Sequence, residues 1–181
     1  MAAATGLTID DFERLPDDLA RNHELLDGEL VEVSGNNLKH NLLRELLARL
    51  LGMHAEERRL GLVVTEQEYD FGGNAYGPDV SFVSASKRPL LNMDLRVQRL
   101  VPDLAIEIVS QNDTFEKLMK KARRYRKCGT KEVWIFDTEG REAVVLADNR
   151  RVILEAKDQF QSDLIPGFSI RLNDLFDDIS R

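Results

Sequence analysis

One carboxylate, Glu107, lies in a segment whose pattern is typical of a buried strand. In Pro102–Ser110 (PDLAIEIVS), the residues on both sides of the expected strand are apolar apart from Glu107. Two apolar faces indicate a central strand rather than an edge strand. An ionised carboxylate there costs free energy unless a cation or hydrogen-bond donors meet it. The sequence therefore predicts a partner for Glu107, and a metal ion is the most economical one.

A second carboxylate, Asp79, follows Pro78 at the start of the preceding expected strand. Asp79, Ser81 and Val83 share one face of that strand. If the two strands are neighbours, we expect the carboxylates of Asp79 and Glu107 to lie within about 4–6 Å of each other, a separation that one cation can bridge. Such hard oxygen ligands favour Mg²⁺ or Mn²⁺, which retain waters and leave room for a phosphate oxygen.

Phosphodiester hydrolysis at such a site also needs a lysine to polarise water or to stabilise charge on the phosphate. Two residues after Glu107 the chain has Val109 and no lysine, so the following helix is the alternative source. At 100° per residue, Lys121 lies about 40° from Tyr125, at the edge of the helix's apolar stripe. By geometry alone, a lysine whose stem covers the core and whose head reaches water is the simpler interpretation.

The elements that would position these side chains can be read from periodicity and turn residues. Thr8 and Asp11 are typical of a capped helix start, and Asp27-Gly28 of a hairpin turn within 23–33. Further along we expect a helix over 38–59, strands at 62–71 and 76–83 paired as a hairpin, an irregular connection over 87–100, a strand at 104–109, a helix at 114–128, and strands at 132–136, 142–147 and 151–155. The expected helix stripe at 114–128 is Phe115, Leu118, Ala122 and Tyr125. A right-handed crossover over 104–136 predicts a mixed sheet with a helix on each face.

Composition sets limits on the class of protein. The chain has 181 residues, 43% hydrophobic and 31% charged, which indicates one globular domain over 1–181. No apolar run is long enough to cross a membrane and no basic leader precedes an apolar stretch, so a cytoplasmic location is expected. Cys128 is the only cysteine, which excludes an internal disulfide and a cysteine-rich zinc site.

The charge is unevenly distributed. With 25 Lys+Arg and 32 Asp+Glu the net charge is −7, unlike a protein that coats nucleic acid without specificity. Between Lys117 and Lys131, however, basic residues occur with no acid among them. A local positive face is one interpretation, and a solvated helix surface is the simpler one.

Several segments, in order, resemble the Uma family of restriction-endonuclease-like proteins, in the PD-(D/E)xK nuclease superfamily. The matching segments are 23–30, 78–83, 102–110, 113–114, 121–125, 129–137 and 164–169. The resemblance implies a restriction-endonuclease-like mixed α/β fold with an extra N-terminal hairpin and C-terminal strands. In such proteins the superfamily lysine is thought to lie on the helix, which fits Val109 and selects Lys121.

Three further positions are candidates for supporting roles, one of them either Gln67 or Glu68. Glu24 matches an acidic residue of the family. It could contact the metal or one of the metal's ligands, or it could be a strand-edge carboxylate that faces solvent. Gln67 or Glu68 could face the site, since alternation does not decide between them. Ser110 could cap the following helix or contact a ligand phosphate.

Two conspicuous side chains have simpler interpretations than catalysis. His40 falls on the helix arc shared by Leu47 and Leu51, which indicates a partly buried structural histidine rather than a catalytic base. Tyr125 and Trp134 are expected to be core residues.

Together these observations predict a Mg²⁺- or Mn²⁺-dependent DNA endonuclease. Asp79 and Glu107 would hold the metal, and Lys121 would orient or activate the attacking water. A homodimer is expected because cutting both strands needs two sites. The alternative is a catalytically silent nuclease-like module for binding or assembly, in a mobile-element or defence system. The acidic charge favours the module, whereas the carboxylate pair favours the enzyme.

Overall fold

A central sheet carries the strand with Glu107. The structure is a computed structural model that describes residues 6–33, 35–110, 113–148 and 150–180. The sheet's order is β11-β10-β9-β8-β6-β3, formed by Arg150–Glu155, Glu142–Ala147, Glu132–Asp137, Leu104–Ile108, Val80–Ser84 and Gly61–Thr65. Strand β8 pairs antiparallel with β6 and parallel with β9. The prediction that 104–109 forms a central strand, with a crossover to a parallel neighbour, is confirmed.

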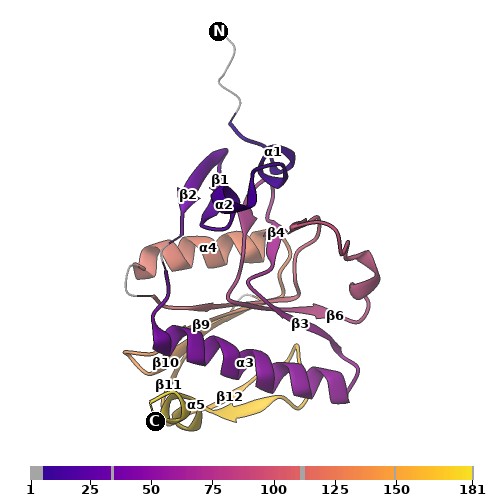
Figure 1. The fold of residues 1–181 in the computed structure, drawn as a ribbon. Helices are drawn as coiled ribbons and strands as arrows, with labels where there is room; N and C mark the ends of the chain where they lie inside the picture. The colour runs from indigo at the N-terminus through magenta and orange to yellow at the C-terminus, as the bar shows by residue number, and fades with distance from the viewer. Residues whose placement is uncertain (1–5, 34, 111–112, 149, 181) are drawn as a thin grey trace.

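Two helices cover opposite faces of this sheet, α3 (Leu38–Glu57) and α4 (Phe115–Lys127) (Figure 1). Leu104, Ile106 and Ile108 of β8 belong to the core cluster on the α3 face, and Ala105 belongs to the cluster on the α4 face. The apolar stripe of α4 differs from the prediction at one position. Phe115 is 53% exposed, and Met119 is buried in its place. Phe115 lies in the first turn of α4, where its ring meets the Arg151 guanidinium instead of the core.

Local hydrogen bonds set where the helices begin and end. The side chain of Asn37 accepts from the backbone N–H of His40 at the start of α3, and that of Thr114 accepts from Lys117 at the start of α4. Of the two roles considered for Ser110, capping of α4 is therefore wrong, because Thr114 is the cap. The backbone N–H of Ser110 instead donates to Asp113 at 2.9 Å. Gly129, at φ 110°, follows α4 in a conformation that suits glycine at a helix C-terminus.

A second, smaller sheet lies beyond α4 (Figure 1). Its order is β2-β1-β5-β4-β7, formed by Glu29–Glu32, His23–Leu26, Ala75–Tyr76, Glu68–Asp70 and Val97–Gln98. The predicted N-terminal hairpin is β1–β2, with Asp27 and Gly28 at positive φ. The short helices α1 (Ile9–Glu13) and α2 (Asp17–Ala20) precede it, and the Thr8–Asp11 capping box is present.

The hairpin expected over 62–71 and 76–83 is divided between the two sheets. Strands β3 and β6 pair in the central sheet, while β4 and β5 pair in the smaller one. The chain leaves the first strand at Glu66, which has a positive φ of 53°, and enters β6 after Gly77 and Pro78. Pro78 has no N–H to donate, and a left-handed residue ends regular pairing. The region 87–100, expected to be irregular, contains β7 and the 3₁₀ helix η1 (Arg88–Leu90).

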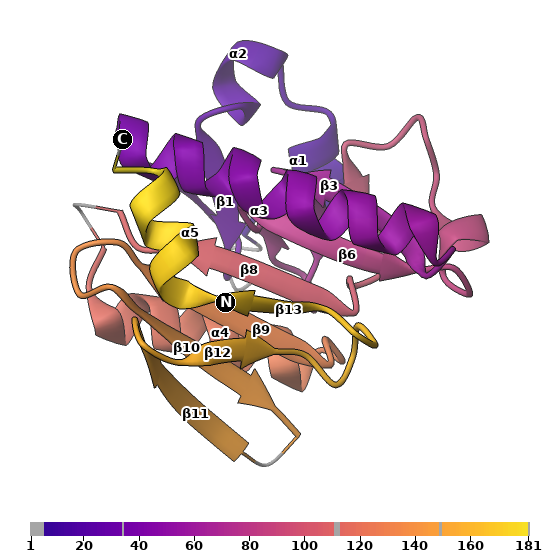
Figure 2. The ribbon, with the colours of Figure 1, turned by 90° about the horizontal axis from the view of Figure 1, so that it is seen from below.

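The C-terminal segment packs on the α3 side of the central sheet (Figure 2). It contains the paired strands β12 (Gln159–Gln161) and β13 (Ser169–Arg171), followed by α5 (Leu172–Asp178), a helix that the sequence patterns did not predict. Buried Glu132 of β9 accepts hydrogen bonds from Ser162 Oγ and the Leu164 N–H, which tie this segment to the sheet.

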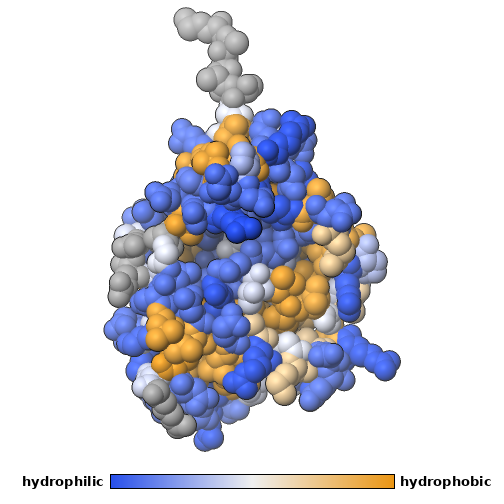
Figure 3. All heavy atoms as spheres, viewed as in Figure 1, coloured by the Kyte–Doolittle hydropathy of each residue, from blue (hydrophilic) through white to orange (hydrophobic). Residues whose placement is uncertain are grey.

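The outer surface is mainly polar on the face that Figure 3 shows, with apolar areas separated by hydrophilic ones. Within the described part of the chain, none of the helices combines the length and apolarity that crossing a bilayer requires.

Candidate active site

Asp79 and Glu107 lie on neighbouring strands at one end of the central sheet. Val80 pairs with Ile106, so continuing this antiparallel register by one residue sets Asp79 opposite Glu107. Directly opposite residues have Cβ atoms about 4.5–5.5 Å apart. The Oδ2 atom of Asp79 accepts the backbone N–H of Ile108 at 2.7 Å, which fixes Asp79 to β8 itself. The register therefore agrees with the expected carboxylate pair.

Glu107 is buried, with 5% of its surface exposed. The Tyr125 hydroxyl donates to Oε1 at 2.6 Å, and Lys121 Nζ lies 3.2 Å from Oε1 and 3.3 Å from Oε2. Burial raises the pKa of Glu107 to about 7; Lys121 opposes the rise, whereas the Asp79 carboxylate adds to it. Glu107 thus has less positive charge around it than a fully ionised carboxylate needs.

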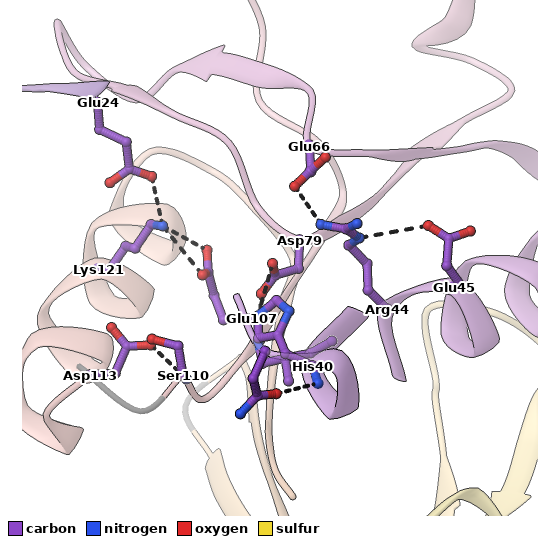
Figure 4. Close-up of polar contacts among 12 residues, drawn as sticks. Glu24, His40, Arg44, Glu45, Glu66, Asp79, Glu107, Ser110, Asp113 and Lys121 are labelled. Atoms are coloured by element: carbon purple, nitrogen blue, oxygen red, sulfur yellow. Dashed lines mark hydrogen bonds and ion pairs between the residues drawn. The ribbon is translucent and has the colours of Figure 1, made fainter. Parts of the chain in front are cut away.

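Lys121 joins two carboxylates from different parts of the chain (Figure 4). Its Nζ donates to Glu24 Oε1 at 2.8 Å as well as contacting Glu107, and it lies 5.4 Å from the centre of the Tyr76 ring. Burial alone would lower the pKa of Lys121, but the Glu107 and Glu24 carboxylates raise it above its ordinary value. The lysine head therefore lies among carboxylates as a charged ammonium, not in open water.

Of the predicted supporting residues, Glu24 contacts Lys121 at the site, whereas Gln67 and Ser110 make hydrogen bonds to other groups. Glu24 comes to the site from β1, and only 16% of its side chain is exposed, so it is no solvent-facing strand-edge residue. The Gln67 amide instead donates to the backbone oxygens of Glu68 and Arg96, and the Ser110 N–H to Asp113. Of Gln67 and Glu68, it is Glu68 that senses the charge of Glu24. Burial raises the pKa of Glu68 to about 7, with Arg96 opposing the rise and Glu24 adding to it.

Two side chains that the sequence indicated as purely structural, His40 and Tyr125, contact the candidate metal ligands. His40 Nε2 lies 3.2 Å from Asp79 Oδ1 with the ring almost fully buried (Figure 4). The Tyr125 hydroxyl donates to Glu107. The helix arc of His40 correctly indicated burial. No pattern in the sequence indicated Asp79 as its partner.

The donors suit a hard divalent cation that keeps part of its own hydration. Asp79 and Glu107 supply carboxylate oxygens. Within the described residues, no group of three or more His, Cys, Asp and Glu side chains is arranged to hold a metal, so the protein would supply two ligands here and not a complete shell. Mg²⁺ is commonly held by one or two carboxylates, with waters and substrate phosphates completing its shell. The raised pKa of Glu107 marks a carboxylate that a cation would stabilise in its ionised form.

The mixed sheet between α3 and α4 forms an α/β fold that is also found in a solved structure. The chain superposes with a TM-score of 0.84 on the crystal structure of "a putative nuclease belonging to DUF820 from Anabaena variabilis ATCC 29413". The two are 20% identical, over 96% of this chain and 99% of that one. This likeness confirms the predicted mixed α/β fold class.

Residues 9–173 match the model of the Uma2 family, described as "Putative restriction endonuclease", and the chain belongs to this family. The predicted family resemblance is thus confirmed. A part of the DrdV–DNA complex, solved by cryo-electron microscopy, aligns with a TM-score of only 0.43 and 18% identity, over 75% of this chain and 11% of that one. No curated protein matches the chain.

Proposed function

We propose that the protein is a Mg²⁺- or Mn²⁺-dependent endonuclease that hydrolyses phosphodiester bonds in DNA. One observation carries the proposal: the charged Lys121 of α4 contacts the buried Glu107, whose pKa is raised in part by the charge of Asp79. Perturbed carboxylates beside a partly buried lysine are typical of sites that perform chemistry. Membership of the Uma2 family supports the nuclease class. We also propose a homodimer, since cutting both strands needs two sites.

Asp79 and Glu107 would hold the divalent ion. When bound, such an ion lowers the pKa of water and neutralises charge on the scissile phosphate. The Ile108 N–H and the Tyr125 hydroxyl each occupy one position on these carboxylates and limit their rotation. Each carboxylate oxygen has two lone pairs, so acceptor capacity remains for a cation.

Lys121 would orient the attacking water and stabilise negative charge on the phosphate. A charged ammonium has donors only and no lone pair with which to take a proton. The raised pKa of Lys121 therefore favours orientation over activation as a general base. Glu24 would hold the ammonium in place when the phosphate arrives.

The alternative is a catalytically silent nuclease-like module. The ion pair between Lys121 and Glu107 favours it, because the buried carboxylate already has an internal partner. A buried pair can persist for structural reasons alone.

DNA cleavage by the 181-residue chain tests the proposal. We expect wild-type protein to cut duplex DNA with Mg²⁺ or Mn²⁺, and Asp79→Ala to lose cleavage while keeping its circular-dichroism spectrum. Asp174→Ala is the matched control, because Asp174 is an exposed aspartate of α5 that pairs with Arg171. Equal cleavage by Asp79→Ala and wild type would contradict the assigned site.

A further inference from the structure

A buried histidine, His40, lies against the proposed metal ligand Asp79. The residue is 3% exposed, and its Nε2 is 3.2 Å from Asp79 Oδ1. Its other ring nitrogen, Nδ1, is also buried and has no hydrogen-bond partner within the described residues. Burying a polar ring in this way costs free energy, so its contact with a carboxylate calls for an explanation.

The position of His40 is fixed from the backbone upward. The Asn37 side chain accepts the His40 backbone N–H at 2.9 Å, which sets the first turn of α3. Leu43 and Leu47, further along the helix, are buried in the core on the same side of the sheet. The imidazole is therefore carried by a rigid element and not by a loop.

Asp79 is consequently held between two elements. His40 of α3 contacts Oδ1 and the Ile108 N–H of β8 donates to Oδ2 at 2.7 Å. Asp79 itself lies just before β6, where the Asp79 carbonyl accepts the Glu66 N–H at 3.3 Å. Without the imidazole, the Asp79 carboxylate would keep the hydrogen bond from the Ile108 N–H and lose its contact with His40.

The surroundings of the two ring nitrogens indicate which of them carries the proton. At 3.2 Å from Asp79 Oδ1, Nε2 is the ring nitrogen placed to carry a proton toward the carboxylate, and Nδ1 is then left as the acceptor. Because Nδ1 is buried, the ring offers no exposed lone pair to an attacking water. This arrangement suits holding Asp79 and does not suit general-base catalysis.

We infer that His40 is a positioning residue that orients Asp79 for the divalent cation. The inference rests on the proposed function, because it assumes that Asp79 binds metal. Hydrogen-bonding partners of metal ligands commonly contribute about 10–100-fold to metal affinity or activity when removed. His40 acts here through Asp79 and has no direct contact with the reacting atoms.

Mn²⁺ binding to the 181-residue chain without DNA tests the inference, measured from the electron paramagnetic resonance signal of free Mn²⁺. We expect His40→Ala to weaken Mn²⁺ binding about 10–100-fold. His40→Gln should restore most of the affinity, because its side-chain amide nitrogen can donate from about the position of Nε2. The Mg²⁺ concentration for half-maximal DNA cleavage should shift in parallel.

A matched control is His54→Ala, which removes another α3 histidine. His54 Nε2 lies 2.9 Å from the Pro166 carbonyl, far along the helix from His40, and this variant should bind Mn²⁺ like wild type. Thermal melting of each variant separates lost folding from lost affinity, and His40→Gln guards against a misfolded alanine variant.

The outcomes separate this inference from the proposed function. If wild-type protein binds Mn²⁺ and cuts DNA while His40→Ala binds Mn²⁺ equally well, the positioning role is wrong and the nuclease proposal stands. Equal weakening by His40→Ala and His40→Gln would also overturn the role, since the donor would then not matter. If wild-type protein neither binds Mn²⁺ nor cuts DNA, both are overturned.

Discussion

Two buried carboxylates in neighbouring strands have different surroundings. Glu132 accepts hydrogen bonds from neutral groups, among them Trp134 Nε1 at 2.9 Å, and its contacts secure the C-terminal segment. Glu107 instead contacts the charged Lys121, and the nearby Asp79 carboxylate helps to raise its pKa. Burial alone therefore does not distinguish a functional carboxylate from a structural one. The charged neighbours make that distinction.

At the residue scale, replacing Lys121 by methionine should affect catalysis far more than metal binding. We expect Lys121→Met to lower single-turnover DNA cleavage about 100-fold or more, because it removes a charge that stabilises the phosphate. Mn²⁺ affinity should stay equal or rise, since a positive charge beside the cation is lost. Lys120→Met is the control, because Lys120 is an exposed neighbour on α4. Lost Mn²⁺ affinity with retained turnover would show that the assigned role is wrong.

The sequence predicted part of this site because alternation and helix angle are local properties. They placed Asp79 and Glu107 on neighbouring strands and Lys121 at a helix edge, and it was the resemblance to the Uma family that selected Lys121 over a solvent-facing lysine. The roles of His40 and Tyr125 could not be predicted in this way. Their hydrogen bonds depend on how α3 and α4 are placed on the sheet, and periodicity reports burial but not the partner.

At the scale of elements, the sequence correctly predicted the long helices and strands with a regular apolar period. It did not predict that the chain passes from one sheet into another within a single expected strand. Both core helices and the strand–helix–strand unit over β8, α4 and β9 were predicted because each has a strong apolar period. The strands expected at 62–71 and 76–83 were divided at Glu66 and Gly77-Pro78. Alternation continues across such a break, so it cannot indicate that the chain has passed into another sheet.

Glu68 of β4, in the smaller sheet, makes the free energy of unfolding depend on pH. Its carboxylate lies 3.2 Å from Arg96, whose guanidinium lies over the Phe12 ring of α1. Burial raises the pKa of Glu68 from its ordinary value of 4.5 to about 7, although Arg96 opposes the rise. The folded state therefore binds more protons than the unfolded state between these values. The contribution of Glu68 to the free energy of unfolding accordingly falls as pH rises from about 4.5 to about 7.

We expect Glu68→Gln to lose less stability than wild type over this pH range and to be the more stable protein at pH 8. Urea unfolding midpoints at pH 5, 6, 7 and 8 measure the effect. Glu29→Gln, an exposed change on β2, should follow the wild-type profile. Parallel profiles for Glu68→Gln and wild type would mean that Glu68 does not titrate in this range.

At the scale of the whole molecule, the charge makes a cation important to any contact with DNA. The chain has a net charge of −7, and Asp79, Glu107 and Glu24 gather carboxylates where a phosphate would have to approach. Lys121 is the ammonium among them. Repulsion between these carboxylates and a phosphate would be reduced by a bound divalent ion. The enzyme and the silent module therefore differ in whether the fold responds to Mg²⁺.

Melting of Glu107→Gln beside wild type decides between them. In metal-free buffer at pH 8 the variant should be as stable as wild type or more stable, because burial has raised the pKa of Glu107 to about 7 and its ionised form is costly. Lys121 keeps its 2.8 Å contact with Glu24 in the variant. For wild type, Mg²⁺ at 100 times its Kd should add about 2.7 kcal/mol, or about 5–10 °C in Tm for a chain of this size.

The Glu107→Gln variant should lack this Mg²⁺-induced rise in Tm, because a neutral amide is a far weaker ligand for a hard cation than a carboxylate. Glu132→Gln is the matched control, since it neutralises a carboxylate equally buried in the next strand. That change disturbs the hydrogen bonds to the C-terminal segment and should lower Tm while leaving the Mg²⁺ response intact. A silent module predicts no response to the ion. Wild type would then melt at one temperature with or without Mg²⁺, as the Glu107→Gln variant does.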